Sequence, residues 1–160
     1  MKGLKKILAC VACMTLVLTG CGLQEKEEVK IVLAQDEVGT YKGVEYSVVS
    51  VEKNTGVEDE IPKEGYEYVV VTVKIENKSR EKISYNPYDW KMENSQGQES
   101  NEAFVVFNND THLNSGDLRR GDVVSGTMVF EQPAQDDGLI LHYYQNSFFD
   151  HEPSISFIIQ

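Results

Sequence analysis

YVVVTVKIEN, the stretch from Tyr68 to Asn77, is the clearest structural signal in this chain. Apolar and polar side chains alternate along it, which is the pattern of a β-strand with one buried and one solvated face. The apolar positions of one parity are Val69, Val71, Val73 and Ile75. We therefore expect these four side chains to point into the core.

Outward from this strand, further short runs rich in Val, Tyr and Phe follow at roughly even spacing, separated by Asn, Gly, Pro and Asp turn residues. They lie at 44–51, 83–92, 104–107, 123–130, 139–144 and 155–159. No long window keeps a helical repeat. This pattern predicts an all-β, immunoglobulin-like β-sandwich of about six to eight antiparallel strands, over residues 39–160.

Three local features refine this expectation. The apolar phase changes parity within 44–51, which predicts a β-bulge near Val48. Gly126 makes a notch in the strand at 123–130, where a bulky neighbour such as Trp90 would press on the backbone; the inward side chains there are Val124, Met128 and Phe130. The patch 31–34 fits an extra edge strand or a few turns of helix, and we favour the strand.

The N-terminus carries a different kind of signal. Lys2, Lys5 and Lys6 precede an apolar run at 7–18. The end of this run leads directly into the stretch Leu18-Thr19-Gly20-Cys21. The run is too short to span a bilayer, which takes about 20 apolar residues. It resembles a bacterial lipoprotein signal peptide with its lipobox, which implies lipidation of Cys21 and cleavage before it.

These observations predict a signal peptide at 1–20, a lipidated cysteine and tether at 21–38, and a lipid-anchored domain on the extracytoplasmic face of the cell membrane. Cys10 and Cys13 form a C-x-x-C pattern, but they lie inside the apolar run and should leave with the signal. The mature domain then has no thiol pair for a disulfide, so its stability must come from a packed core.

The charge balance excludes some partners. Of 15 basic residues, removal of Lys2, Lys5 and Lys6 leaves 12 against 26 acidic ones, so a net charge of −11 becomes −14. Binding to nucleic acid or to bare anionic lipid depends on Lys and Arg contacts with phosphate. We therefore expect no nucleic-acid partner, and a membrane contact only through the lipid on Cys21.

Catalytic motifs are lacking in the sequence, which has no nucleophile elbow, zinc-protease motif, P-loop or dinucleotide fingerprint. We expect neither enzymatic activity nor a cofactor. His151 lies between Asp150 and Glu152, which leaves a weak metal site or a hydrolase as the remotest alternatives, although a solvated loop is favoured.

Two acidic loops keep a second function class open, a calcium-binding accessory or sensory domain. Calcium takes six to eight oxygen ligands from flexible loops. The better candidate is Asn108, Asn109 and Asp110, and the weaker one is 58–60. Neither has the alternate-residue spacing of an EF-hand.

The leading function class is a binding or interaction module with a protein partner in the cell envelope, which the lipobox, the sandwich fold and the lack of catalytic motifs favour. Aromatic residues are its candidate surface, with ordinary core and rim packing as the alternative. Period-two alternation places about half of them outward, and exposed aromatics are favoured anchors of interfaces. The candidate interaction residues are Tyr85, Tyr88, Tyr144, Phe148 and Phe149.

A family resemblance rests on three runs, at 69–79, 90–97 and 118–131. Together they resemble the telokin-like, immunoglobulin-like domain of unknown function found in many Gram-positive lipoproteins, over about 39–157. Arg120 departs from the family pattern, which usually has proline before the Gly-Asp turn. The resemblance implies a stalked extracellular module of sandwich fold, and it supplies no catalytic residue.

Overall fold

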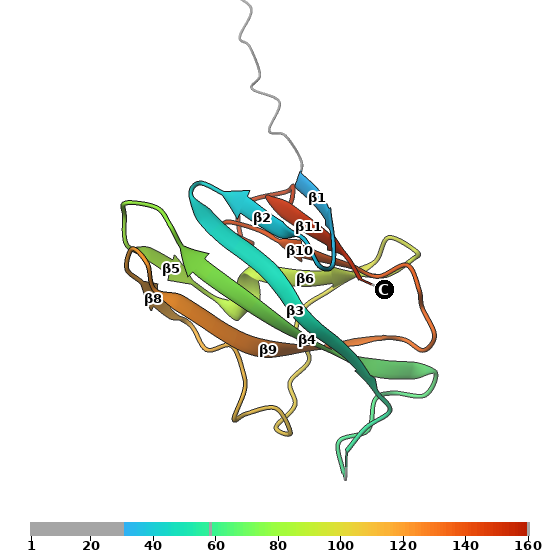
Figure 1. Cartoon of the computed structure of the whole chain (residues 1–160). Coiled ribbons are helices and arrows are strands. Elements are labelled where there is room, and N and C mark those ends of the chain that lie inside the picture. The colour runs from blue at the N-terminus through green and yellow to red at the C-terminus, as the bar shows by residue number, and fades with distance from the viewer. Residues whose placement is uncertain (1–30, 58, 160) are drawn as a thin grey trace, which may run out of the picture.

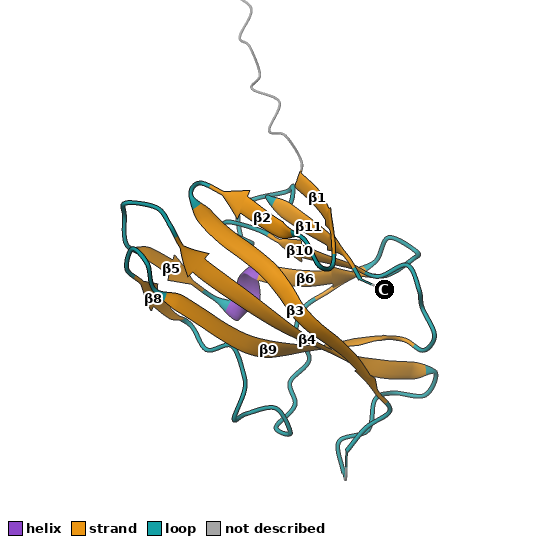
Figure 2. Ribbon diagram, in the orientation of Figure 1, coloured by secondary structure: helices purple, strands orange, loops and turns teal. Residues whose placement is uncertain are grey.

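The computed structural model describes residues 31–57 and 59–159, and this part of the chain is almost entirely β-structure (Figure 2). It contains eleven strands and one 3-10 turn, η1 (Pro87–Asp89). The strands form two main sheets and one small sheet (Figure 1). The expected all-β sandwich is confirmed, but the run at 104–107 lies in a loop and is not a strand. The strands beyond the expected six to eight are short ones.

The four-stranded sheet holds the longest strands in the order β2-β3-β4-β9, and all its pairs are antiparallel. Its members are β2 (Val38–Tyr41), β3 (Val44–Asn54), β4 (Tyr66–Asn77) and β9 (Val123–Pro133). The stretch that opened the sequence analysis is therefore the central strand β4, which pairs along its length with β3 and β9.

The five-stranded sheet has the order β1-β11-β10-β6-β7 and lies behind the first sheet in Figure 1. Its members are β1 (Ile31–Ala34), β11 (Ile155–Ile158), β10 (Ile140–Tyr143), β6 (Trp90–Glu93) and β7 (Glu99–Ser100). The β1–β11 pair is parallel, unlike the others. β5 (Ile83–Tyr85) and β8 (Gly116–Leu118) form the small sheet.

The core lies between the two main sheets, and both contribute to it. The four predicted inward residues of β4, Val69, Val71, Val73 and Ile75, are each fully buried. The opposite sheet supplies larger side chains, namely Trp90, Met92, Leu141, Tyr143, Ile155 and Phe157. Their burial stabilises the domain, because apolar area removed from water is the main stabilising contribution to folding.

The predicted bulge is present in β3, where the register against β4 shifts between Val48 and Ser50. The extra residue, Val49, is 59% exposed. Val48 on one side of the bulge is buried, and Val51 on the other side packs partly against the core. Because of the bulge, the side chains on both sides of it point toward the core, as the change of parity in the sequence predicted.

The close neighbour of Gly126 differs from the expectation. A Cβ on Gly126 would lie 2.6 Å from Leu113 Cα and 2.8 Å from Leu113 N, so the notch accommodates the backbone of Leu113 and not the Trp90 ring. This backbone runs beside β9 and is bonded to it, with Leu113 N donating to Thr127 O at 2.9 Å. A long loop segment, invisible to strand periodicity, therefore occupies the space.

We expect Gly126→Ala to destabilise the domain by about 1–3 kcal/mol, because overpacking against backbone cannot be relieved by a side-chain rotation. The measurement is the urea midpoint of the variant beside that of Val123→Ala, a change at a half-exposed position of the same strand. Equal midpoints would contradict the close approach of Leu113.

The N-terminal patch 31–34 is the strand β1, as favoured from the sequence. It joins the edge of the five-stranded sheet through parallel pairing with β11. Ile31 and Leu33 pack against the core. The sandwich therefore begins at β1, upstream of the domain boundary predicted at Gly39. β1 and the first residue of β2, Val38, lie within the segment 21–38 that was predicted to be a tether.

Candidate binding groove

A groove at one end of the sandwich brings together three segments that are distant in sequence. They are the turn after β2, the loop after β4 and the segment after β10. The main hollow has a volume of about 650 Å³. Two neighbouring hollows share Gln145 with it, so we call the whole surface the Gln145 groove. Its apolar lining comes from Tyr41, Val44, Tyr46, Ile83 and Tyr143.

The first wall is a tight hairpin turn. Lys42 and Gly43 join β2 to β3 with φ angles of 50° and 80°. Positive φ at both central residues matches the right-handed twist of the flanking strands. The turn places Lys42 Nζ against Gln145 Oε1, to which it donates, and 5.0 Å from the centre of the Tyr41 ring.

The second wall is the loop after β4, held by the buried side chain of Asn77. Its Nδ2 donates to Glu81 O at 2.8 Å and to Leu118 O at 2.9 Å, and its Oδ1 accepts from Ser79 N at 2.9 Å. These bonds satisfy backbone polar groups of the loop. As a result, Arg80 is held exposed at the groove wall.

Two tyrosines on facing sheets form the floor. Tyr46 of β3 donates its hydroxyl to that of Tyr143 of β10 at 3.0 Å, and their ring centres lie 4.3 Å apart. Burial raises the pKa of Tyr46 well above its usual range and raises the pKa of Tyr143 to about 12. Both hydroxyls are therefore neutral hydrogen-bonding groups at physiological pH.

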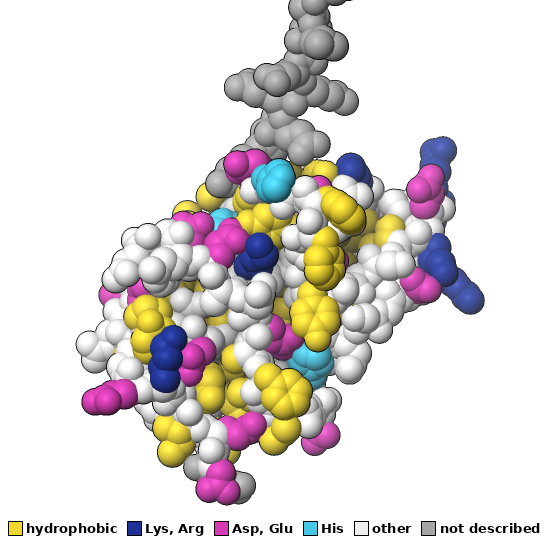
Figure 3. Space-filling view, turned by 180° about the vertical axis from the view of Figure 1, so that it is seen from behind, with side chains coloured by type: hydrophobic (Ala, Val, Ile, Leu, Met, Phe, Trp, Pro, Cys, Tyr) yellow, Lys and Arg dark blue, Asp and Glu magenta, His cyan; other side chains and the backbone are white. Residues whose placement is uncertain are grey.

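Three of the five predicted interaction residues line the Gln145 groove. Tyr85 is half-buried and shares one hollow with Phe148, while Phe149 lines the next hollow. Phe148 and Phe149 are 81% and 78% exposed. Figure 3 shows the molecule from behind, where exposed hydrophobic side chains gather in a band. Solvent-exposed aromatic rings at a groove are the usual anchors of a binding surface.

The other two predicted residues lie elsewhere. Tyr88 of η1 is 63% exposed and lines a separate hollow with Phe104, which is 98% exposed. Tyr144 is not exposed as expected, since only 3% of it is accessible. Its hydroxyl donates to Glu99, and Lys91 Nζ lies 4.9 Å from its ring centre, so charged neighbours on the sheet cover the ring.

The two calcium candidates lie in separate loops, one between β7 and β8 and the other between β3 and β4. Asn108 is buried, and its amide donates to Thr127 Oγ1 at 3.4 Å, while Asn109 and Asp110 are exposed. In the other loop, Glu60 accepts from the backbone N–H groups of Val106 and Phe107 at 2.7 and 2.9 Å. Calcium binding at Asn108–Asp110 stays a prediction.

His151, the remaining histidine candidate, is exposed at the Gln145 groove. It lines the same hollow as Asp150 and Glu152. A role of His151 in catalysis or metal binding stays a prediction.

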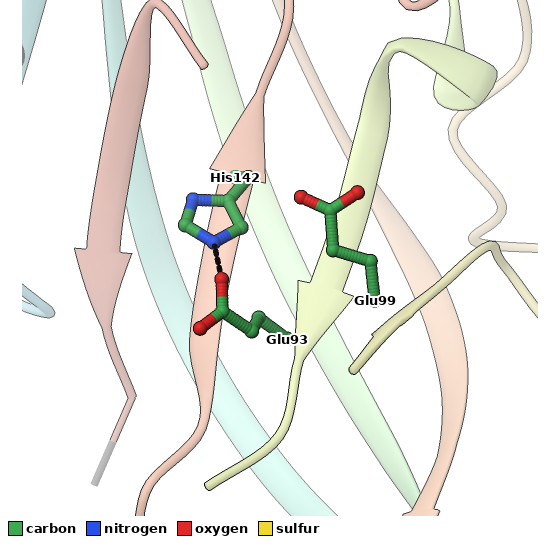
Figure 4. A group of neighbouring side chains, drawn as sticks. All are labelled: Glu93, Glu99 and His142. Atoms are coloured by element: carbon green, nitrogen blue, oxygen red, sulfur yellow. Dashed lines mark hydrogen bonds and ion pairs between the residues drawn. The ribbon is translucent and has the colours of Figure 1, made fainter. Parts of the chain in front are cut away.

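A second cluster, which sequence reasoning missed, lies on the outer face of the five-stranded sheet. It consists of Glu93, Glu99 and His142 (Figure 4). His142 Nε2 is 2.8 Å from Glu93 Oε2, and Lys91 Nζ is 3.2 Å from Glu99 Oε2. The alternation of inward and outward side chains along β6 and β10 was a signal from which the outward position of Glu93 and His142 could have been predicted. Their convergence with Glu99 depends on the strand order.

Cys21 and the signal segment lie outside the described residues, so lipidation stays a prediction. Within the described part of the chain, no helix has the length and apolar character needed to cross a bilayer.

The fold defines an immunoglobulin-like β-sandwich protein. The chain belongs to the family described as a domain of unknown function (DUF4352), whose profile matches residues 34–154. No curated protein sequence matches the chain.

Several solved structures share the fold. The yjhA protein of Bacillus subtilis is 22% identical, with a TM-score of 0.54 over 71% of this chain and 78% of that one. A proposed lipoprotein of B. subtilis, ycdA, is 13% identical with a TM-score of 0.65, over 77% of this chain and 38% of that one. The secreted protein MPT63 of Mycobacterium tuberculosis is 12% identical with a TM-score of 0.61, over 81% and 98%.

Proposed function

We propose that this chain is a lipid-anchored, non-catalytic binding module of the telokin-like, immunoglobulin-like class, held at the extracytoplasmic face of the cell membrane and binding a protein partner in the cell envelope. The Gln145 groove is the binding surface. The observation that carries the proposal is the hollow of about 650 Å³ together with its two neighbours, each of which is lined by one exposed phenylalanine, Phe148 or Phe149.

The proposed location at the cell membrane rests on the N-terminal sequence. The lipobox ending in Cys21 supplies the anchor, and β1 begins at Ile31, so a short segment links the lipid to the sandwich. The structural similarity to a proposed lipoprotein and to a secreted protein is consistent with this location. Two acyl chains give stable membrane attachment where one gives only marginal binding.

The binding role rests on the chemistry of the groove. Ligand sites are concave, mainly apolar and supplied with a few polar groups that fix orientation. Here the tyrosine floor is the apolar part, and the Tyr46 and Tyr143 hydroxyls are neutral donors and acceptors. Lys42 and Arg80 supply two positive charges to the main hollow against the one carboxylate of Glu81. The neighbouring hollows are lined by the carboxylates of Asp89, Asp117, Asp150 and Glu152. The main hollow therefore suits a partner segment that presents an apolar side chain beside a carboxylate.

The test is retention of envelope proteins by the purified protein and by the double variant Phe148→Ser/Phe149→Ser. We expect the double variant to lose at least about tenfold in affinity for the retained partner, because two aromatic anchors each contribute more than about 1 kcal/mol. Its melting temperature should stay near that of the wild type, since both rings are exposed.

The matched control is Phe104→Ser, which removes an exposed ring outside the Gln145 groove. This variant should retain the partner as the wild type does. Equal retention by the double variant and the wild type would reject the groove as the binding surface.

A further inference from the structure

The cluster of Glu93, Glu99 and His142 is independent of the Gln145 groove. His142 lies on the face of β10 opposite to Tyr143, which is part of the groove floor. One candidate ligand atom from each of the three side chains lies within 4.8 Å of the other two. The His142 side chain is 3% exposed, while those of Glu93 and Glu99 are 31% and 32% exposed. The carboxylate side is thus open to solvent.

The sheet register brings two carboxylates directly opposite each other. Glu93 of β6 and Glu99 of β7 are Cα partners. Like charges at directly opposed positions of an antiparallel pair are destabilising unless a cation compensates them. Lys91 compensates Glu99 through the 3.2 Å contact, and Glu93 faces the imidazole of His142. These four side chains therefore carry a surplus of negative charge when the imidazole is neutral.

The histidine is oriented as a metal ligand would be. Its Nδ1 lies 2.8 Å from Ser156 Oγ on β11, and its Nε2 points at Glu93 (Figure 4). A serine hydroxyl can donate or accept. Without a metal, a proton on Nε2 forms the 2.8 Å hydrogen bond to Glu93. When a metal replaces that proton and Ser156 Oγ accepts from Nδ1–H, the Nε2 lone pair faces the ion. Such a hydrogen bond from the second ring nitrogen is the usual companion of a metal-binding histidine.

We propose that Glu93, Glu99 and His142 bind a divalent transition-metal ion, for which zinc is the reference. One imidazole and two carboxylates form a mixed nitrogen and oxygen donor set, which suits zinc at about 2.0–2.2 Å from each donor. Calcium and magnesium favour all-oxygen sets. Rotation of the two half-exposed glutamates closes the donors around the ion, while buried His142 stays fixed. Three protein ligands leave a further position for water or an external ligand.

The experiment is calorimetric titration of zinc chloride into the mature chain that begins at residue 21, with Cys21→Ser so that no thiol competes. We expect one zinc ion per chain, and much weaker binding of calcium and magnesium. His142→Gln and Glu99→Gln should each weaken zinc binding by about tenfold or more. Chemical shifts of the imidazole nitrogens should show His142 Nε2 as the coordinating atom.

The matched control is His112→Gln. His112 Nε2 also contacts a glutamate, Glu102 Oε1 at 2.9 Å, but among the described residues no third His, Cys, Asp or Glu side chain joins that pair. Zinc affinity should be unchanged in this variant. Glu99→Gln keeps an acceptor for Tyr144 at a half-exposed position, so it decides the matter even if the buried His142→Gln variant fails to fold. Absence of zinc binding, or binding that Glu99→Gln leaves unaltered, would overturn the proposal.

Discussion

Val71→Asp and Val73→Asp should each lower the free energy of unfolding by about 3–5 kcal/mol, a large part of the roughly 5–15 kcal/mol that stabilises an ordinary domain. Both side chains are fully buried at the centre of β4, and β4 pairs with β3 on one side and β9 on the other. An aspartate there would place an uncompensated charge in the middle of the sandwich core, where neither water nor a partner can reach it. Urea unfolding followed by tryptophan fluorescence measures the effect through Trp90, which lies in the same core.

The control is Thr72→Asp, between the two on the same strand. Thr72 is half-buried on the opposite face, where its Oγ1 accepts from Ser50 Oγ at 3.0 Å. An aspartate retains an acceptor and reaches solvent, so we expect a change below about 1 kcal/mol. Three variants of equal stability would mean that the inward face of β4 is misassigned.

Cys21→Ser should move the protein from the membrane fraction to the soluble fraction almost completely. The thiol of Cys21 is the acceptor of the proposed lipid, and the mature domain is too acidic to bind an anionic membrane surface by charge. Among the described residues, no helix is long and apolar enough to cross a bilayer. Fractionation after a salt wash, together with the mass of the N-terminal peptide, measures both attachment and modification.

Cys13→Ser is the matched control, because it removes a thiol from the preceding apolar run without altering the lipobox. That variant should stay in the membrane fraction with normal processing. Retention of the Cys21→Ser protein on the membrane after the salt wash would contradict the lipid anchor.

The binding proposal and the metal proposal can fail separately. The double variant at Phe148 and Phe149 alters only the Gln145 groove, and Glu99→Gln alters only the outer face of the five-stranded sheet. Loss of partner binding with unchanged zinc affinity, or the reverse, would therefore assign each effect to its own surface.

The sequence alone determined those features that depend on local alternation. Val71 and Val73 alternate with polar neighbours, and the parity change before Val51 revealed the bulge in β3, because side chains in a strand point to opposite faces with a period of two. The same alternation did not predict that Tyr144 is buried. Its ring lies on an outer face but is covered by Lys91 and Glu99 from other strands.

Only the tertiary structure decided which distant segments meet. Gly126 was recognised as a notch, but its occupant, the backbone of Leu113, belongs to a loop with no periodic signal. The Gln145 groove joins residues near 42, 80 and 145, and the metal cluster needs β6 to lie between β7 and β10. Strand order and register are set by the packing of the whole core. A period-two pattern fixes which face a side chain occupies and leaves open which neighbours it meets there.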